Sequence, residues 1–288
     1  MSFSSDVRAE LAKNIPGSRH CQLAELSALM HFSGQYGQDS DGNLMVGFQT
    51  ENEAVVRKVF TLLKKTFNIE NGVASDEEKK QRLIAKLGDL DAPVHPLIIK
   101  DSCCRRAYLR GAFLCIGSMS DPEKGYHLEF VCAREAQAMQ LQEIINGFGI
   151  EAKIVLRKKY YVVYLKEGSG IVDLLGVMEA HISLMNFENL RILKDVRNNI
   201  NRKVNCETAN IAKTVNAASK QVEDIILLRD VYGLHNLQPS LREIAEVRLE
   251  YPEATLKELG ELLDPPVGKS GVNHRLRKLS ELASKINN

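Results

Sequence analysis

The residue types near the end of the chain are those that form hydrogen bonds with base edges in DNA. From residue 264 onward the chain has five Lys and Arg residues and two acidic residues. Asn side chains can bind adenine and Arg side chains can bind guanine in the major groove. This composition predicts a base-contacting surface formed by Asn273, His274, Arg275, Arg277 and Lys278. The alternative is an ordinary helical hairpin whose exposed face is basic.

Two helices and a turn are needed to present these side chains. Thr255 and Glu258 have the spacing of a capping box, which opens a short helix to Leu263. A turn at Asp264-Pro265-Pro266 follows, and Ser270 is expected to cap a last helix that reaches about Ile286. The apolar residues of both helices are expected to pack together, namely Leu256, Leu259, Leu263, Val272, Leu276 and Leu279. This is a helix-turn-helix arrangement, at about residues 255–287.

The same segment offers groups that bind phosphate. Backbone N–H groups at the start of a helix can hold an anion, and Lys side chains add positive charge. We expect phosphate contacts from Lys257, Lys269, Ser270 and Gly271. Upstream, Ser240 to Glu243 forms a second capping-box pattern, which predicts a helix ending near Tyr251. The DNA-binding domain is expected at residues 219–288.

A basic helical connector is predicted between this domain and the rest of the chain, at residues 186–218. The segment Arg191–Lys220 contains seven Lys and Arg residues and two acidic residues, and it is rich in Asn. One interpretation is a solvated helix face, which is the usual meaning of a charged run. The other is a surface that contacts the DNA backbone through Arg197, Asn198, Asn201, Arg202, Lys203 and Asn205.

The first part of the chain is expected to be an internal duplication. The segment Leu109–Gly117 is a run of small and apolar residues ending in Gly, and Leu26–Gly34 is a weaker copy of it. Landmarks recur in the same order at offsets of 81 to 83 residues, in the pairs Leu26/Leu109, Phe48/Phe130, Glu53/Glu135 and Phe67/Phe148. We therefore predict an α+β fold, a duplicated αββαββ domain with pseudo-two-fold symmetry whose halves are residues 1–100 and 101–185. Strands near Val73 and at Arg82–Leu87 are expected to complete the first half.

Composition and charge limit the kinds of function that this protein can have. The net charge is +1, with 38 basic and 37 acidic residues, so any surface for nucleic acid must be local. The first residues have neither a basic nor an apolar signal region, and no apolar run approaches membrane-spanning length. The six cysteines have no CxxC spacing. We expect reduced, mostly buried thiols in a cytoplasmic, nucleoid-associated protein, with no bound metal and no cofactor.

The chain resembles a known family over essentially its whole length. The two nine-residue segments resemble degenerate LAGLIDADG motifs, the paired helices of homing endonucleases. The segments Leu256–Leu263, Pro265–Leu279 and Asn201–Asn210 resemble the WhiA family, in which a LAGLIDADG-like domain precedes an all-α helix-turn-helix domain similar to region 4 of a sigma factor.

This resemblance implies a bacterial transcription regulator that binds specific DNA sequences. It implies control of sporulation genes in spore-forming actinobacteria, and a part in cell division and chromosome segregation in other Gram-positive bacteria. The expected ligand is double-stranded promoter DNA, which can include the protein's own promoter. RNA polymerase or another transcription factor is the expected protein partner, and no membrane contact is expected.

A metal-dependent nuclease is the main competing hypothesis. LAGLIDADG endonucleases carry an acidic residue at the eighth motif position of each helix, where the two carboxylates hold divalent metal. The eighth positions here are Ser33 and Ile116, and the nearby Asp39 and Asp121 are expected in loops beyond the helices. No phosphate-binding loop or nucleophile elbow is found. We therefore expect no catalytic residue and no enzyme activity. A protein-binding adaptor in cell division is a third hypothesis.

Overall fold

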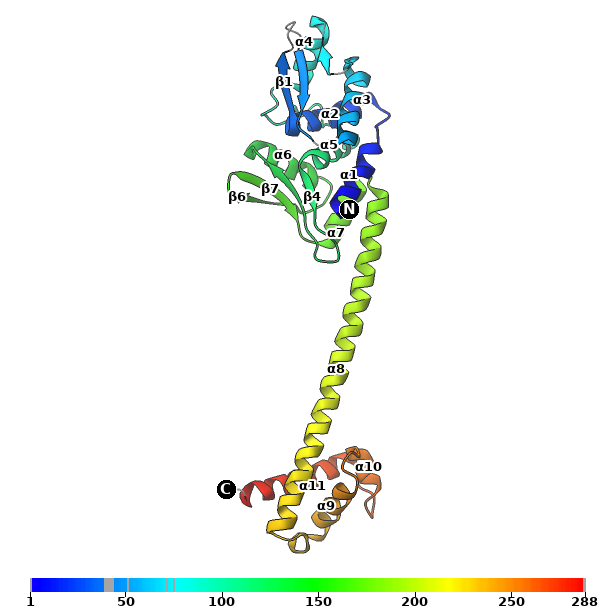
Figure 1. Cartoon of the computed structure of the whole chain (residues 1–288), viewed down its shortest axis with the longest axis vertical. Helices are drawn as coiled ribbons and strands as arrows, with labels where there is room; N and C mark the ends of the chain where they lie inside the picture. Colours follow the sequence, from blue (N-terminus) through cyan, green and yellow to red (C-terminus); the bar gives the residue numbers. More distant parts are fainter. Residues whose placement is uncertain (1, 39–43, 51, 71, 75, 287–288) are drawn as a thin grey trace. The chain divides into compact units, whose positions relative to one another are not determined.

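The structure is a computed structural model that describes residues 2–38, 44–50, 52–70, 72–74 and 76–286. The chain divides into two compact units, Met1–Val196 and Arg197–Asn288 (Figure 1). Each unit has its own apolar core. None of the helices in the described ranges is long and apolar enough to cross a membrane.

The first unit consists of two similar halves that each begin with a helix and an antiparallel strand pair. The elements up to residue 87 are α1 Phe3–Lys13, α2 Arg19–Ser33, β1 Gly34–Gln38, β2 Leu44–Phe48, α3 Glu53–Phe67, β3 Val73–Ala74 and α4 Glu77–Leu87. The second half contains α5 Ser102–Ile116, β4 Gly117–Met119, β5 Leu128–Cys132, α6 Glu135–Asn146, β6 Lys153–Arg157, β7 Tyr160–Leu165 and α7 Gly168–Val177.

The strand register confirms the predicted duplication. Gly34 follows α2 and pairs with Phe48, and Gly117 follows α5 and pairs with Phe130 in the same way. The predicted landmarks Phe48 and Phe130 therefore occupy equivalent positions in the two sheets. The first sheet has strand order β1-β2-β3 and the second has order β4-β5-β7-β6.

The two halves differ where a strand was predicted at Arg82–Leu87. That prediction is wrong, because this segment belongs to α4. Asp76 caps the helix through a hydrogen bond from the Glu78 backbone N–H, and Gly88 ends it with a positive φ of 68°. The acidic first turn and Lys86 in the last turn also suit the helix dipole. In the second half, the corresponding part of the chain forms the hairpin of β6 and β7.

Helices α2 and α5 cross at the centre of the first unit, as the small residues of the two motifs predict. A Cβ atom added at Gly111 would lie 2.6 Å from the Glu25 carbonyl oxygen and 2.9 Å from the Ala28 Cβ. Only a glycine allows this approach of the two backbones.

A cluster of buried charges lies beside this crossing. Glu25, Lys58 and Arg110 are almost fully buried. The Glu25 carboxylate pairs with Lys58 and lies 3.1 Å from the Arg110 Nε, and Arg110 also contacts Glu179 at 2.7 Å. The Lys58 Nζ donates to the carbonyl oxygens of Leu11 at 2.7 Å and of Asn14 at 2.6 Å. Burial lowers the pKa of Lys58, and the Glu25 carboxylate opposes that shift. The cluster therefore joins α1, α2, α3 and α5.

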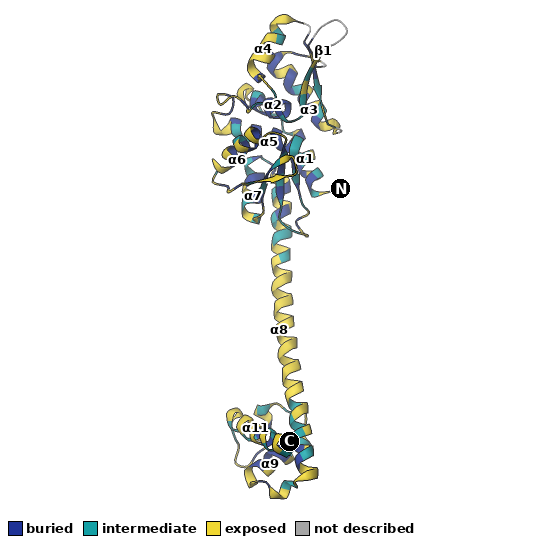
Figure 2. Cartoon of the chain, turned by 90° about the vertical axis from the view of Figure 1, so that its left-hand side faces the viewer, coloured by how far each residue is buried: buried dark blue, intermediate teal, exposed yellow. Residues whose placement is uncertain are grey.

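A single helix, α8 His181–Val231, contains the whole predicted connector. Its first part packs in the first unit, where Phe187 is fully buried, and its last part contributes Ile225 and Leu228 to the core of the second unit. The helix is continuous from His181 to Val231, and Gly233 follows its end with a positive φ of 83°. Residues 195–217 are all exposed (Figure 2).

The second unit is helical, as predicted. A short 3-10 turn, Leu234–Asn236, follows α8, and three helices complete the unit: α9 Pro239–Glu250, α10 Leu256–Glu261 and α11 Lys269–Ile286. Two predicted caps are wrong. Pro239 is the first residue of α9, so Ser240 lies inside the helix and Gln238 precedes it without a side-chain cap. Helix α11 begins at Lys269, so Ser270 also lies inside its helix.

Candidate nucleic-acid interface

The α10–turn–α11 segment forms a tightly closed helix-turn-helix. Both hydrogen bonds of the predicted capping box are present, because Thr255 N–H donates to the Glu258 carboxylate at 2.7 Å and Glu258 N–H donates to the Thr255 hydroxyl at 3.4 Å. The backbone and side-chain donors of Thr255 hold the pKa of Glu258 below its usual value. The predicted apolar contacts are also found, since Leu259, Leu263 and the stripe Val272, Leu276 and Leu279 are buried.

Gly260 brings the turn against α10. The Val267 N–H donates to the Gly260 carbonyl at 2.9 Å. A Cβ atom at Gly260 would lie 2.1 Å from the Val267 carbonyl oxygen and 3.2 Å from the Val272 side chain. The glycine therefore determines how closely the turn approaches α10, and with it the start of α11.

One exposed face of α11 carries the polar residues best placed for a ligand. Ser270, Asn273, His274 and Arg277 are exposed and follow one another at helical spacing, on the side opposite Val272, Leu276 and Leu279. Among the residues that the structure describes, Arg277 is paired only with Glu281, at 3.2 Å one turn along the same exposed surface. Such a pair contributes little energy, so it leaves the guanidinium available to a ligand.

Arg275 lies elsewhere. Its guanidinium lies 3.5 Å from the Glu243 carboxylate and 3.4 Å from the Ser240 carbonyl oxygen, and the side chain is largely covered. Glu243 also accepts a hydrogen bond from the Asp264 N–H at 2.9 Å. Arg275 therefore connects α11 to α9 and to the turn, which is a positioning contact that the sequence did not indicate.

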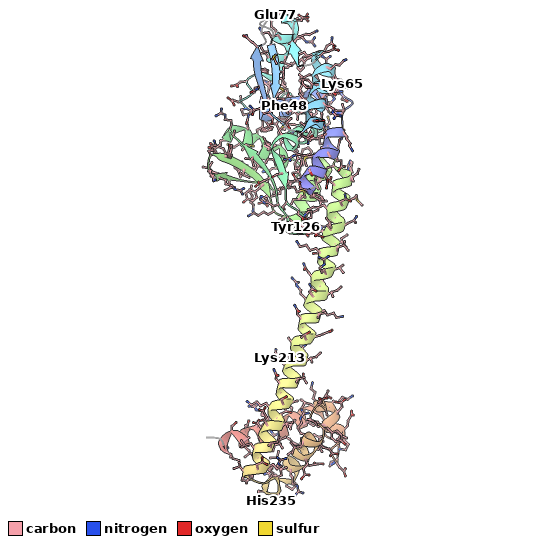
Figure 3. The ribbon with its side chains drawn as sticks, in the orientation of Figure 1. Phe48, Lys65, Glu77, Tyr126, Lys213 and His235 are labelled. Carbon is pink, nitrogen blue, oxygen red and sulfur yellow. The ribbon has the colours of Figure 1, made fainter. Side chains whose placement is uncertain are left out.

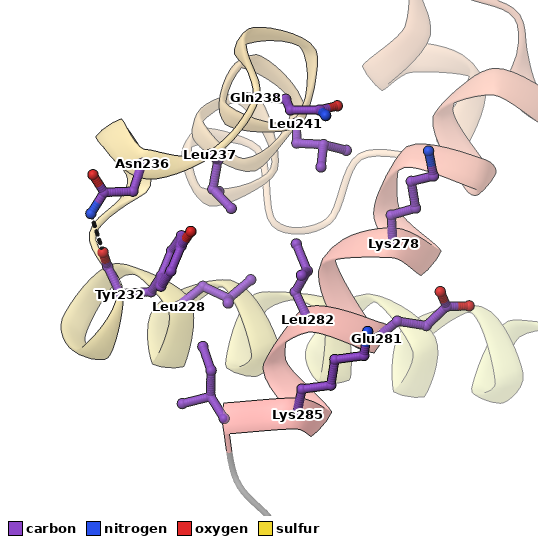
Figure 4. Close-up of a pocket in the computed structure, with 11 residues that line it drawn as sticks. Leu228, Tyr232, Asn236, Leu237, Gln238, Leu241, Lys278, Glu281, Leu282 and Lys285 are labelled. Atoms are coloured by element: carbon purple, nitrogen blue, oxygen red, sulfur yellow. Dashed lines mark hydrogen bonds between the residues drawn. The ribbon is translucent and has the colours of Figure 1, made fainter.

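The remaining predicted residues surround this face. Lys278 lines a pocket of about 410 Å³ between α8, α9 and α11, together with Glu281 and Lys285 (Figure 4). Lys269 is exposed at the start of α11, beside the partly covered Gly271. Lys257 on α10 is exposed and lies 3.7 Å from Glu261.

The predicted connector residues are all exposed on α8. Arg197, Asn201 and Asn205 follow one another four residues apart, so they share one side of the helix, and Asn198 and Arg202 lie next to them. Lys203 points to another side, because it is two residues from both Asn201 and Asn205. Five of the six residues therefore form one polar strip.

Arg248 is a buried residue that the sequence analysis did not identify. It donates to the side-chain Oε1 of Gln221 at 2.7 Å and to the Ala254 backbone carbonyl at 2.6 Å. Burial lowers the pKa of its guanidinium. Arg248 thus ties α9 to α8 and to the segment before α10. A charged residue in an amphipathic helix gives no sequence signal for such a role.

The two nuclease positions lie at the ends of their helices, where the resemblance places them. Ser33 is the last residue of α2 and Ile116 is the last residue of α5. The Arg8 guanidinium donates to the Gly117 carbonyl next to these ends. Asp121 accepts a hydrogen bond from the Glu123 N–H in its own turn, and Asp39 lies outside the described residues. A cation beside the helix ends opposes binding of a second cation there.

The alternation along the hairpin of β6 and β7 predicts one buried face, made of Ile154, Leu156, Tyr161, Val163 and Leu165. Leu156 departs from this pattern, because its side chain is exposed in the edge strand β6. Arg157 lies 3.2 Å from Glu129 of β5, so the charge of this face is partly neutralised. Tyr126 lies before β5 (Figure 3), under the Lys194 ammonium of α8 at 4.9 Å from the ring centre.

Comparisons with known proteins agree with this architecture. Three family models match in succession, described as the WhiA N-terminal LAGLIDADG-like domain at residues 19–83, the WhiA LAGLIDADG-like domain at 105–197 and the WhiA C-terminal HTH domain at 200–283. The chain is 53% identical to a probable cell division protein WhiA of Lachnoclostridium phytofermentans, over 98% of each chain. It is 47% identical to the protein of the same name from Clostridium beijerinckii, over 99% of each chain.

A solved structure also resembles the whole chain. The crystal structure of full-length DUF199/WhiA from Thermatoga maritima matches with a TM-score of 0.59 and 25% identity, over 99% of each chain. The order of a LAGLIDADG-like domain followed by a helical domain is therefore shared.

Proposed function

The chain belongs to the WhiA family. From this premise we propose that it regulates transcription by binding specific DNA sequences, and that this regulation acts in bacterial cell division. The observation that carries the proposal is the exposed face of α11, where Asn273, His274 and Arg277 stand on a helix-turn-helix held by Gly260 and Arg275. In such motifs the N-terminal part of the second helix contacts base edges in the major groove.

The proposal assigns different roles to different residues. Asn273 and Arg277 contact bases, since their side chains can form the bidentate pairs with adenine and guanine. The start of α11, at Lys269, Ser270 and Gly271, contacts phosphate together with Lys257. The polar strip of α8, with Lys203 beside it, contacts the DNA backbone, which adds affinity without sequence preference.

The biological role follows the family. We propose that the DNA sites are promoters, the protein's own among them, and that RNA polymerase or another transcription factor is the protein partner. A nucleoid-associated protein with these properties would act in cell division and chromosome segregation, and its counterparts in spore-forming relatives would act in sporulation.

We further propose that the first unit is not a nuclease. Ile116 cannot bind a metal, and Arg8 places a positive charge next to the helix ends where metal would have to bind. The observation that would contradict this is Mg²⁺-dependent nicking of DNA at stoichiometric protein, abolished by a chelator. A cell-division adaptor that works without DNA would instead show binding to its partner that is insensitive to salt.

The DNA role is tested by mapping the protein's sites across the genome of its own organism, and then by measuring affinity for one site and for unrelated DNA at the same salt. Arg277→Ala and Asn273→Ala should each lower the preference for the specific site by about 1–3 kcal/mol, because each removes a bidentate base contact. Arg197→Ala combined with Arg202→Ala should weaken binding to both DNAs alike and reduce the salt dependence.

The matched control is Lys285→Ala, which removes a cation from the far end of the same helix, next to the pocket of Figure 4. It should leave the preference unchanged. Equal preference in the Arg277→Ala variant and the unsubstituted protein would show that the exposed face of α11 does not contact bases.

A further inference from the structure

Four potential metal ligands meet at the N-terminal ends of α2 and α5. They are His20, Cys21, Cys103 and Cys104, and their ligand atoms all lie within 4.8 Å of one another. The His20 Nδ1 is 3.1 Å from the Cys104 Sγ, 3.4 Å from the Cys21 Sγ and 4.0 Å from the Cys103 Sγ. This cluster lies at the opposite end of the helix pair from Ser33 and Ile116.

The two-fold repeat explains why these side chains meet. His20 and Cys103 are 83 residues apart, and so are Cys21 and Cys104, which is the offset of the two helix motifs themselves. His20 and Cys21 lie in the first turn of α2, and Cys103 and Cys104 lie in the first turn of α5. These two helices pack against each other. Equivalent positions of the two halves therefore converge on one point. No CxxC motif is needed for this arrangement, which is why the cysteine spacing did not reveal it.

The separations are close to those between the ligand atoms of a tetrahedral zinc ion. With Zn–S bonds of about 2.3 Å and a Zn–N bond of about 2.0–2.1 Å, neighbouring ligand atoms of a tetrahedron lie about 3.5–3.8 Å apart. The three distances from the His20 nitrogen lie on both sides of this range. Three cysteines and one histidine are also a common ligand set of structural zinc sites.

The cluster is accessible to an ion from solvent. Cys21 and Cys104 are buried, whereas His20 and Cys103 are exposed, so an ion can reach the cluster from solvent. All four ligands belong to the protein, which leaves no position for a substrate.

We propose that His20, Cys21, Cys103 and Cys104 bind a structural Zn²⁺ ion that fastens the two halves of the first unit together. The ion links the first turns of α2 and α5, and it supplements the glycine-mediated crossing at Gly111 with a direct bond across the pseudo-two-fold axis. It takes no part in DNA recognition, which belongs to the second unit.

The proposal is tested on the full-length protein, purified under reducing conditions and analysed for metal by mass spectrometry. Zinc should be present at one ion per chain. After removal of the zinc, added Co²⁺ should produce the thiolate-to-cobalt charge-transfer bands and the intense d–d bands of a tetrahedral site with sulfur ligands. Cys103→Ser and His20→Gln, which change the two exposed ligands, should weaken metal binding by at least about 10–100-fold, the loss seen when even an outer-shell partner is removed.

Cys206→Ser is the matched control, because it removes an exposed cysteine from the middle of α8. It should retain both the zinc and the cobalt spectrum. A chelator should lower the melting temperature of the unsubstituted protein and of Cys206→Ser, but not that of Cys103→Ser, and circular dichroism identifies any variant that has failed to fold.

Two results would overturn the proposal. One is an unsubstituted protein that contains no zinc and gives no cobalt–thiolate bands. The other is a disulfide between Cys21 and either Cys103 or Cys104 in protein kept under reducing conditions, since two of the three sulfur ligands would then be oxidised and could not bind the ion as thiolates. Neither result would affect the DNA-binding proposal, which is measured separately with α11 variants.

Discussion

At the scale of single residues, the charges buried inside the first unit affect its free energy of unfolding more than the charges on its surface. Glu25 is fully buried and faces two cations, Lys58 and Arg110. Removing one partner from such a group leaves the other charges buried without compensation, and this costs far more than removing an exposed pair. This cluster could not be predicted from local pattern, because acidic and basic residues in amphipathic helices are usually solvated.

Glu25→Ala should therefore lower the free energy of unfolding of the first unit by about 3–5 kcal/mol. Glu53→Ala, which breaks the exposed pair with Arg57, should change it by less than about 1 kcal/mol. Chemical denaturation followed by circular dichroism measures both. If the two variants lose equal stability, the buried cluster has no special role.

Arg275 and Arg277 illustrate which site residues were predictable. Their spacing on α11 follows from sequence, but both were predicted to contact bases. Only the tertiary structure distinguishes them, because Glu243 of α9 draws Arg275 to the flank of the helix. The residues of α11 were thus predictable from local pattern, and their division between base-contacting and positioning roles was not.

At the scale of elements, the elements that were predicted correctly are those with strong local signals. The capping box at Thr255 and the apolar stripe of α11 are both found as expected. The strand that was wrongly predicted at Arg82–Leu87 would have made the first half match the β6–β7 hairpin of the second half. Local helix signals from Asp76 to Gly88 prevailed over that symmetry.

The turn of the helix-turn-helix offers a prediction at this scale. Gly260→Ala should destabilise the second unit by roughly 1–3 kcal/mol, because the new Cβ would overlap the Val267 carbonyl and push the turn away. Gly268→Ala is the control in the same turn, since a Cβ there meets no atom within 4 Å, and it should change stability by less than about 0.5 kcal/mol. Hydrogen exchange of the α11 amides measures both. Equal exchange in the two variants would contradict the close packing of this turn.

At the scale of the whole molecule, α8 belongs to both units but its middle belongs to neither core. Residues 195–217 are exposed throughout, and Lys213 projects into solvent (Figure 3). A helix segment without packed neighbours opens at little cost in free energy. The duplication and the helical domain could be predicted from sequence, but the continuity of α8 could not, because the change of composition near residue 185 resembles a domain boundary.

Trypsin should therefore cut first at Arg or Lys residues between 197 and 213, releasing two fragments that remain folded. Specific DNA should slow this cleavage, because the polar strip of α8 is proposed to contact phosphates. Cleavage after the exposed Lys65 of α3 should be unaffected by DNA (Figure 3). Mass spectrometry of the early fragments identifies the sites. Cleavage in α8 that is equally fast with and without specific DNA would exclude the connector from the complex.

The crossing of α2 and α5 also has a consequence for the order in which the protein folds. Glu25 and Arg110 meet across 85 residues of chain, whereas contacts in the second unit, such as the 27-residue span from Gln221 to Arg248, are more local. Contacts between distant residues form slowly, since a long loop must close first. During synthesis, the apolar side of α2 must wait for α5 to leave the ribosome. The first unit is therefore the slow-folding part of the molecule and the part most exposed to aggregation on the way.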